Sequence, residues 1–252
     1  MTPSDYVLET ENLTKSFSGY TAVREVNLRV RRGTIHALIG PNGAGKTTMF
    51  NLLTGFLAPT SGRIRHNGED ITGLEPAAVA RRRLARSFQI SSVFPHMTVL
   101  ENVRLALQRA LGTAFHFWRA EKSLDVLRAR ADELIEAVGL SGFSATPAAE
   151  LPYGRKRALE IATTLALDPE VLLLDEPMSG LAQEEVGRVT DLIRAAARER
   201  TVLMVEHNLS VVADLSDAIT VLTRGQILAE GPYEKVSREP QVVEAYMGTG
   251  RA

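Results

Sequence analysis

The sequence contains no cysteine and no long hydrophobic run. Without cysteine, the chain can form neither disulfides nor thiolate metal sites, and it has no thiol nucleophile, which is compatible with a reducing compartment. No stretch of about 18 consecutive apolar residues is present, so no segment is predicted to span a bilayer. Residues 1–11 lack the basic head and apolar segment of a secretory signal. We therefore expect a cytosolic protein whose membrane role, if it has one, comes through a partner.

An excess of charge of one sign is also missing. The 29 Lys+Arg and 30 Asp+Glu residues leave a formal net charge of −1. Affinity for phosphate backbones depends on a clear basic excess, so the composition predicts no nucleic-acid partner. The 252 residues, 44% hydrophobic and 23% charged, indicate a globular protein with a sizeable core. This length suits one domain, with or without an inserted subdomain.

Hydrophobic periodicity predicts an α/β chain with a helical insertion. Spacing typical of strands occurs at residues 7–12, 23–30, 35–39, 171–174 and 202–205. Helical spacing occurs at residues 46–57, 99–110, 124–138, 158–165 and 186–197. The strand–helix–strand order over 171–205 predicts a parallel sheet with right-handed crossovers. Turn signals predict hairpins at Asn67-Gly68 and at Arg224-Gly225.

A phosphate-binding pattern follows the third predicted strand. The eight residues fit G-x-x-x-x-G-K-[ST] and are Gly40, Pro41, Asn42, Gly43, Ala44, Gly45, Lys46 and Thr47. Backbone N–H groups of such a loop can wrap a β-phosphate, and the N-terminus of the following helix adds positive potential. Lys46 would reach the β/γ-phosphates, and the Thr47 hydroxyl would bind Mg²⁺. The alternative is a glycine-rich turn before a core helix, but the strand before and the helix after favour the phosphate site.

A pair of carboxylates ends the apolar run at 171–174. Asp175, at the C-terminal end of a buried strand, would face the bound Mg²⁺ directly or through water. Glu176 would orient or deprotonate the water that attacks the γ-phosphate, which is typically worth about 10² to 10⁴ in rate. Alone, such a pair is more often a solvated strand end, and the phosphate loop upstream reverses that preference.

His207 and Gln89 carry less information on their own. His207 follows the apolar run 202–205, where a single histidine is more often packed or exposed than catalytic. Gln89 is one amide near a predicted helix boundary, and its default interpretation is a surface residue.

Together, these residues resemble the ATP-binding subunit of ABC transporters over nearly the full chain. The resemblance implies an α/β fold with a P-loop NTPase (RecA-like) core, an N-terminal antiparallel β-subdomain and an inserted α-helical subdomain. It implies one ABC ATPase domain over 1–252. The core and β-subdomain would be formed by 1–88 and 156–252, the helical subdomain by 89–155, and a short helical tail by 232–252.

The resemblance also implies a role for each site residue. Phe17 would stack on adenine, Gln89 would contact Mg²⁺ near the transmembrane partner, and His207 would sense the γ-phosphate. The implied catalytic residues are Glu176, His207 and Lys46. The implied cofactors are ATP and Mg²⁺, with Thr47, Gln89 and Asp175 at the metal. The remaining nucleotide contacts would come from Phe17, Gly40, Pro41, Asn42, Gly43, Ala44, Gly45, Lys46 and Thr48.

Several segments are similar to the ATPases of branched-chain amino acid importers. They are Phe88-Gln89-Ile90, residues 94–102, Leu159-Glu160-Ile161-Ala162, Val205-Glu206-His207-Asn208 and the ending at 240–248. Related ATPases for urea or amide uptake and for lipopolysaccharide export share much of this pattern, and they remain alternatives. The implied partners are a second ABC ATPase subunit (a sister chain or a second copy), transmembrane permeases and, indirectly, an extracytoplasmic substrate-binding protein. The implied location is the inner face of the plasma membrane.

The signature of the family departs from its usual Leu-Ser-Gly-Gly-Gln. Here, Leu151 is followed by the residues predicted to face the partner's ATP: Pro152, Tyr153, Gly154 and Arg155. Proline has neither the hydroxyl that normally binds the γ-phosphate nor an N–H, although it suits the first turn of a helix expected over 155–167. Ala182 replaces the usual D-loop aspartate. We therefore expect reduced turnover at the ATP site that this signature completes.

Two function classes compete with transport. A soluble ABC ATPase acting on DNA, ribosomes or protein assembly would usually carry coiled-coil insertions, fused cassettes or zinc-binding cysteines, and none occurs here. A non-hydrolytic scaffold is suggested by Pro152 and Ala182. The residues that argue against it are Lys46, Asp175, Glu176 and His207.

Two clusters stay ambiguous from sequence alone. The arginines at 81–83 and 86 form either a phosphate-binding patch or a solvated face. Phe115, Phe117 and Trp118 either pack within the helical subdomain or contact the permease.

Overall fold

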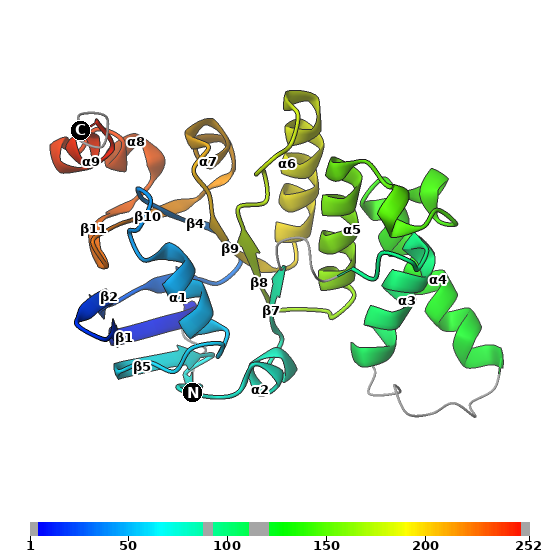
Figure 1. Ribbon diagram of the computed structural model, residues 1–252, viewed down its shortest axis with the longest axis horizontal. Coiled ribbons are helices and arrows are strands. Elements are labelled where there is room, and N and C mark those ends of the chain that lie inside the picture. The colour runs from blue at the N-terminus through cyan, green and yellow to red at the C-terminus, as the bar shows by residue number, and fades with distance from the viewer. Residues whose placement is uncertain (1–4, 88–92, 111–120, 248–252) are drawn as a thin grey trace. The chain divides into compact units, whose positions relative to one another are not determined.

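The computed structural model of the chain describes residues 5–87, 93–110 and 121–247 (Figure 1). The chain forms two compact units. Unit 1 comprises Met1–Leu84, Glu170–Pro177 and Ala197–Ala252, and unit 2 comprises Ala85–Pro169 and Met178–Ala196. The subdomain boundaries expected from the sequence, at 88/89 and 155/156, stay a prediction. Unit 2 extends beyond residue 155 and also contains residues 156–169 and 178–196.

An antiparallel sheet forms the N-terminal part of unit 1. Its strands are β1 (Tyr6–Phe17), β2 (Tyr20–Val26), β3 (Arg29–Arg31), β5 (Ser61–His66) and β6 (Glu69–Asp70). The order is β2-β1-β5-β6, and β3 pairs with β1. The expected strand at 23–30 is divided between β2 and β3. The hairpin predicted at Asn67-Gly68 is confirmed, because both residues have positive φ and β5 pairs antiparallel with β6.

A second, mostly parallel sheet carries the predicted site. Its strands in unit 1 are β4 (Ile35–Ile39), β8 (Val171–Asp175), β9 (Thr201–Val205), β10 (Ala218–Thr223) and β11 (Gln226–Gly231). They lie in the order β11-β10-β4-β9-β8, with all neighbours parallel except β10 and β11. Every residue of β4, β8 and β9 is buried, which explains their continuous apolar runs. The expected parallel sheet and final hairpin are confirmed.

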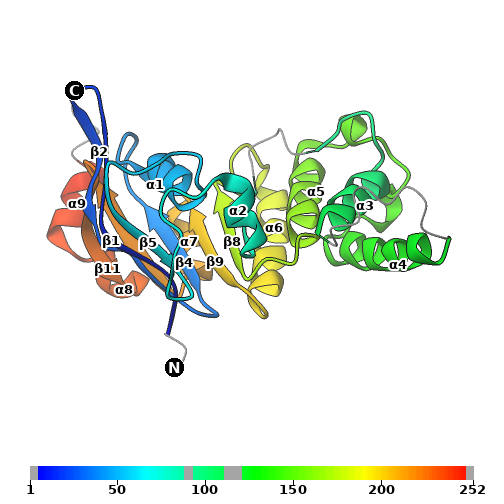
Figure 2. The same cartoon turned by 90° about the horizontal axis from the view of Figure 1, so that it is seen from below.

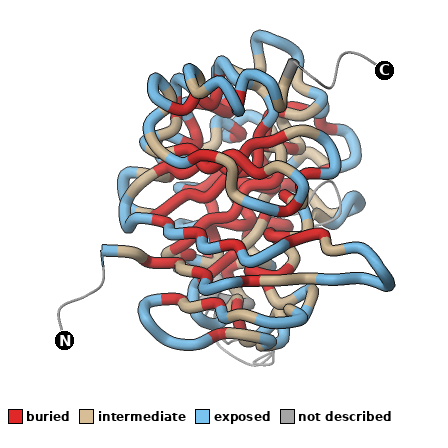
Figure 3. Tube along the Cα trace, turned by 90° about the vertical axis from the view of Figure 1, so that its left-hand side faces the viewer, coloured by how far each residue is buried: buried red, intermediate tan, exposed pale blue. Residues whose placement is uncertain are grey.

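The core of unit 1 surrounds the helix α1 (Lys46–Leu53). Met49, Phe50 and Leu53 are completely buried and belong to one apolar cluster with side chains of β1, β2, β8 and β9. In Figure 1, α1 lies between the antiparallel strands and the parallel sheet. Figure 3 shows the buried residues along the inner stretches of the trace and the exposed ones mostly at its outer bends. α1 is thereby fixed at the C-terminal end of β4.

Among the described residues, four further helices belong to unit 1. They are α2 (Pro76–Arg81), α7 (Leu209–Leu215), α8 (Tyr233–Val236) and α9 (Pro240–Met247). α8 and α9 lie beside β11 in both Figure 1 and Figure 2, and both contact this strand. Strand β7 (Leu84–Ser87) begins at the last residue of the first segment of unit 1.

Unit 2 is built from helices, as the periodicity predicted. They are α3 (Val99–Ala110), α4 (Glu121–Ala137), α5 (Tyr153–Leu165) and α6 (Gln183–Ala197), with short 3₁₀ turns at Ser141–Phe143 and Ala148–Glu150. α3 begins at a capping box, because Thr98 N donates to Glu101 Oε2 at 2.8 Å and Glu101 N donates to Thr98 Oγ1 at 3.2 Å. The helix expected over 155–167 is wrong at both ends, since α5 runs from Tyr153 to Leu165. Pro152 therefore precedes the helix, with an extended ψ of 154°.

No helix in the described ranges is both long and apolar enough to cross a membrane.

Candidate active site

The loop between β4 and α1 follows a path that only glycine permits. Gly40, Gly43 and Gly45 have φ angles of 150°, 77° and 104°. A Cβ on Gly40 would lie 2.1 Å from the carbonyl oxygen of Leu222, and one on Gly45 would lie 2.5 Å from that of Ala22. Both carbonyls belong to strands of unit 1, so they cannot move aside freely. The pattern at 40–47 is therefore a tightly fixed backbone loop as well as a sequence motif.

Lys46, the first residue of α1, is held inside this loop. Its ammonium donates to the carbonyl oxygens of Gly40 at 2.7 Å and Pro41 at 3.0 Å, and the residue is only 9% exposed. Burial lowers the pKa of Lys46, whereas the negative charges of Glu176 and Asp175 act in the opposite direction. The first N–H groups of a helix lack intrahelical acceptors and create a positive end. Lys46 and the start of α1 therefore combine to favour an anion.

The two predicted carboxylates lie at the end of β8, where the sequence placed them. Asp175 is 6% exposed and is in register with Val205 of the neighbouring strand β9. Glu176 N donates to the Val205 carbonyl oxygen at 2.9 Å, and Glu176 has a φ of 46°. A positive φ is uncommon for a residue with a side chain and costs energy that the surroundings must offset. The carboxylates of Asp175 and Glu176 both act electrostatically on Lys46, so the structure brings these three charged side chains together in unit 1.

His207 lies just beyond β9 and is exposed. Its position is set by Glu206, which is completely buried and accepts hydrogen bonds at Oε2 from the N–H groups of His207 (3.0 Å) and Asn208 (3.2 Å). Asn208 in turn caps α7 by accepting from the N–H of Ser210 and Val211. The sequence reasoning missed Glu206 as a site residue. The available signal was a carboxylate directly after an apolar strand and before the histidine.

Phe17 ends β1 and faces Tyr20 across the β1–β2 hairpin. The two rings are 44% and 58% exposed, and the Lys15 ammonium lies 5.2 Å from the centroid of the Phe17 ring. An exposed ring with one face free is suited to stacking on a flat heterocycle. The hairpin therefore offers two aromatic candidates where the sequence reasoning considered one.

In unit 2, the predicted signature forms the start of α5. A Cβ on Gly154 would lie 2.2 Å from Glu185 Oε1, so the glycine lets this carboxylate approach the start of α5 closely. Glu185 Oε2 accepts a hydrogen bond from the Ala182 N–H at 3.1 Å, which ties the D-loop position to the first turn of α6. Tyr153 is 41% exposed, and the Arg155 guanidinium lies 3.6 Å from the centroid of the Phe143 ring. Arg155 is thus engaged within its own unit by a cation–π contact.

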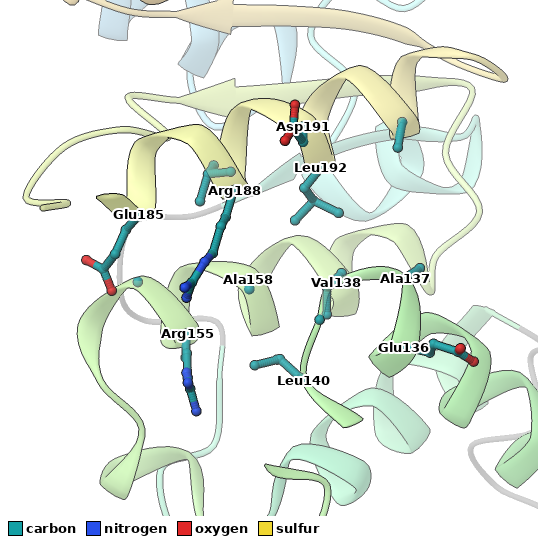
Figure 4. A pocket seen from close by; sticks show the side chains of 14 residues that line it. Glu136, Ala137, Val138, Leu140, Arg155, Ala158, Glu185, Arg188, Asp191 and Leu192 are labelled. Carbon is teal, nitrogen blue, oxygen red and sulfur yellow. The ribbon is translucent and has the colours of Figure 1, made fainter. Parts of the chain in front are cut away.

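A cavity of about 570 Å³ lies beside this segment of unit 2 (Figure 4). Its lining comes from the end of α4, the start of α5 and one face of α6. Figure 4 shows the Arg188 side chain extending from α6 toward the first turn of α5. Charged and apolar side chains therefore line both sides of the cavity, with Arg188 on α6 and Arg155 on α5 as its cationic groups.

Comparison with known proteins identifies the family. The family model "ABC transporter" matches residues 23–179. The chain belongs to the ABC transporter family. A second model, "Branched-chain amino acid ATP-binding cassette transporter", matches residues 226–252 of this ABC protein.

Two relatives of this ABC protein match over almost their whole length. The high-affinity branched-chain amino acid transport ATP-binding protein BraF of Pseudomonas aeruginosa is 40% identical, over 96% of this chain and 98% of the relative. The corresponding protein LivG of Escherichia coli is 38% identical, over 97% and 99%. A crystal structure of a nucleotide-free ATP-binding cassette from an ABC transporter superposes with a TM-score of 0.84 at 31% identity, over 96% and 98%. The predicted fold class is therefore confirmed.

Members of this family that bind ATP are ATPases coupled to transport, and they work as dimers with membrane permease components. The predicted enzyme class and ATP as the cofactor are thus confirmed. Gln89 and the aromatic cluster of Phe115, Phe117 and Trp118 lie outside the described residues of this ABC ATPase.

The residues of this ABC ATPase that are present at the loop suit Mg²⁺. Thr47 supplies an exposed hydroxyl next to Lys46, and Asp175 supplies a carboxylate that acts electrostatically on the same lysine. Mg²⁺ prefers oxygen ligands and is usually bound through one or two protein groups together with substrate phosphates.

Proposed function

We propose that residues 40–48 bind the phosphates of ATP and that the chain hydrolyses ATP to energise the import of branched-chain amino acids. The main support for the nucleotide site is the loop whose path requires glycine. It encloses the buried Lys46, whose pKa is affected by the charges of Asp175 and Glu176. Two matches to transporter models support the cargo. One covers residues 23–179, and the other, specific for branched-chain amino acid systems, covers residues 226–252.

Phosphate binding would exchange the partners of Lys46. In the structure, its ammonium donates to two carbonyl oxygens of the loop. A triphosphate offers charged acceptors to the same ammonium, and charge-assisted hydrogen bonds are roughly twice as strong as neutral ones. The N–H groups at the start of α1, near Thr47 and Thr48, would bind the remaining phosphate oxygens. The lysine therefore moves from the loop to the ligand without leaving its buried position.

Hydrolysis then depends on the groups at the ends of β8 and β9. Mg²⁺, held by Thr47 and Asp175, would neutralise the charge that develops on the phosphate oxygens. Glu176 would take the proton from the attacking water, because it directly follows Asp175 and its carboxylate acts electrostatically on the same lysine. His207 would contact the γ-phosphate from a turn held by Glu206.

The ATP site is proposed to be completed by a second ATPase subunit. One loop covers only one side of a nucleotide, and fast phosphoryl transfer needs charge stabilisation and exclusion of water on the other. The start of α5 with Pro152, Tyr153, Gly154 and Arg155 would be the surface that this chain offers to the partner's ATP. The proposed assembly contains a sister chain or a second copy, transmembrane permeases at the inner face of the membrane and, indirectly, an extracytoplasmic binding protein.

Two measurements test this proposal. In the first, Glu176→Gln should bind ATP as tightly as the wild type and accumulate the closed dimer, while its steady-state hydrolysis falls by about 10² or more. Hydrolysis at the wild-type rate would remove Glu176 from the role of base.

The second measurement tests the cargo. The chain is purified together with its permeases and reconstituted in vesicles, and uptake of radiolabelled leucine is measured with and without ATP. ATP-dependent uptake of leucine, competed by isoleucine and valine, is expected. ATP hydrolysis without any such uptake would contradict the branched-chain assignment and leave the ATPase assignment intact.

A further inference from the structure

The cavity of unit 2 has the size of a small-molecule site. Its volume of about 570 Å³ lies within the usual range of about 300–1,000 Å³. The end of α4, the start of α5 and one face of α6 form its lining, and all of these residues belong to unit 2. None of the described residues that line it is aromatic, so a nucleobase would find no ring to stack on. The lining therefore favours a ligand other than a nucleotide.

One face of α6 gives the cavity a charged end and an apolar end. The lining residues of this face are spaced at i, i+3, i+4 and i+7, which places them on one side of a helix. They are Glu185, Arg188, Val189 and Leu192. The helical rise of about 1.5 Å per residue separates Glu185 from Leu192 by about 10 Å along the axis. A small molecule lying along α6 would therefore contact charges at one end and aliphatic side chains at the other.

Two opposite charges of this face are available to a ligand. The Arg188 side chain extends toward the first turn of α5 (Figure 4), and it forms no hydrogen bond or ion pair with the residues that the structure describes. Glu185 accepts from the Ala182 N–H through Oε2, at 3.1 Å, and its Oε1 lies beside Gly154. Because Arg188 and Glu185 are three residues apart on one helix, their Cβ atoms are about 5–6 Å apart.

The other charged side chains of the lining are engaged or lie elsewhere. The Arg155 guanidinium stacks on the Phe143 ring, and Asp191 forms an ion pair with Arg194 at 2.9 Å. Glu136 is on the end of α4, apart from Arg188 in Figure 4. Arg188 and Glu185 are therefore the adjacent pair that can take the charges of a ligand.

Adjacent opposite charges followed by an aliphatic surface match the chemistry of an aliphatic α-amino acid. Its carboxylate would accept charge-assisted hydrogen bonds from the planar Arg188 guanidinium, and its ammonium would donate to Glu185. Its side chain would lie against Val189 and Leu192. A phosphate or a dicarboxylate would instead bring negative charge close to Glu185, so these anions fit less well.

We infer that this cavity binds a free aliphatic amino acid and that its occupation lowers ATP turnover. Glu185 is the link, because its carboxylate holds the Ala182 N–H and lies against Gly154 in the predicted signature. A ligand ammonium at Glu185 competes with the Ala182 N–H for this carboxylate, which loosens the D-loop position. Amino acid binding itself does not depend on the proposed function, whereas the effect on turnover rests on it.

Binding is tested by calorimetric titration of the full chain with L-leucine, up to about 10 mM. We expect saturable binding of one leucine per chain. Arg188→Gln should weaken it about tenfold or more, because a charge-assisted contact is lost, and 4-methylpentanoate, which lacks the ammonium, should bind the wild type more weakly by a similar factor. Arg130→Gln, at an exposed arginine of α4 that does not line the cavity, should leave the Kd unchanged. Absence of leucine binding, or equal affinity of Arg188→Gln and the wild type, would overturn the inference.

Methyl NMR spectra of the wild type locate the ligand without any variant. Unlabelled leucine should shift the signals of Val138, Val189 and Leu192, which line the cavity, and leave that of Leu53 in the core of unit 1 unchanged. Shifts confined to unit 1 would place the ligand elsewhere and overturn the inference even if Arg188→Gln does not fold.

The effect on turnover is measured on the ATPase dimer assembled with its permeases, without the substrate-binding protein. Leucine should lower the ATPase rate about fivefold or more in the wild type, the lower end of typical coupling between sites, and leave that of Arg188→Gln unchanged. A wild-type rate that ignores bound leucine would overturn the coupling through Glu185. If the assembly hydrolyses no ATP at all, the proposed function fails, and the leucine titration still decides whether the cavity is an amino acid site.

Discussion

Alanine at Gly40 and alanine at Gly43 should have very different costs, although both changes add one methyl group to the same loop. Gly43 has a φ of 77°, and a Cβ there would meet nothing within 4 Å. Gly43→Ala therefore costs only the left-handed conformation, about 1–2 kcal/mol. At Gly40, the φ of 150° is nearly exclusive to glycine, which costs about 1–3 kcal/mol.

The second cost at Gly40 is steric. The new methyl group would lie 2.1 Å from the Leu222 carbonyl oxygen. A relaxed contact between carbon and oxygen is about 3.3 Å or longer, so the two backbones must separate by about 1 Å. Leu222 lies in β10, which is paired with both β4 and β11 and resists this movement. Overpacking of this kind typically adds about 1–3 kcal/mol, and the total for Gly40→Ala is then about 2–6 kcal/mol.

The assay is thermal unfolding of both variants without nucleotide. For a chain of this size, each kcal/mol lowers Tm by about 2–4 °C. We expect a drop of about 2–8 °C for Gly43→Ala and a larger drop, about 4–24 °C, for Gly40→Ala. Equal drops for the two variants would refute the claim that the Leu222 carbonyl confines the loop.

Three further predictions concern other parts of the molecule. Phe17→Ala should weaken MgATP binding about tenfold or more, since an aromatic ring stacked on a base is worth about 1–3 kcal/mol; Tyr20→Ala serves as the matched control, and the reverse result would give the stacking role to Tyr20. Pro152→Ser should raise the steady-state ATPase rate of the assembled dimer about tenfold, because the serine restores a donor to the γ-phosphate; an unchanged rate would count against it. Burial lowers the pKa of His36 to about 4. The unfolded chain, with a histidine pKa of about 6.5, therefore binds more protons between pH 6.5 and pH 4, and stability falls as the pH falls through this window. The free energy of unfolding, measured with urea, should therefore fall between pH 7 and pH 4 by up to about 3 kcal/mol less in His36→Gln than in the wild type. The same pH dependence of this free energy in both proteins would contradict the prediction.

Much of the fold could be predicted because buried strands consist of apolar residues, which are recognisable in the sequence. β4, β8 and β9 are buried at every residue, and each reads as a short, mostly apolar run. The functional loop was equally visible, since its path requires glycine at positions where a Cβ would meet a backbone carbonyl. Asp175 and Glu176 could be placed because the end of a buried strand was clear.

Other features depend on contacts between distant parts of the chain and left no local signal. β1 extends over 12 residues with irregular register against its neighbours, whereas periodicity indicated only its first half. The start of α5 was placed two residues late, because Pro152 was assigned to the first turn, and its extended ψ became visible only in the structure. Glu206 was passed over because the side chain of a strand-end carboxylate points outward by default, and here it binds the backbone of the next turn.

The most direct test of the account is a calorimetric titration of the purified chain with MgATP, using Glu176→Gln to suppress hydrolysis. The same titration is repeated with Lys46→Ala in that background. Saturable binding of one nucleotide per chain is expected. Affinity should fall by about 10- to 100-fold or more without the lysine, because a charge-assisted contact to phosphate is worth about 1.5–3 kcal/mol and the carboxylates of Asp175 and Glu176 also lose their counter-charge. An absence of binding, or affinity that is unchanged in Lys46→Ala, would contradict the central claim.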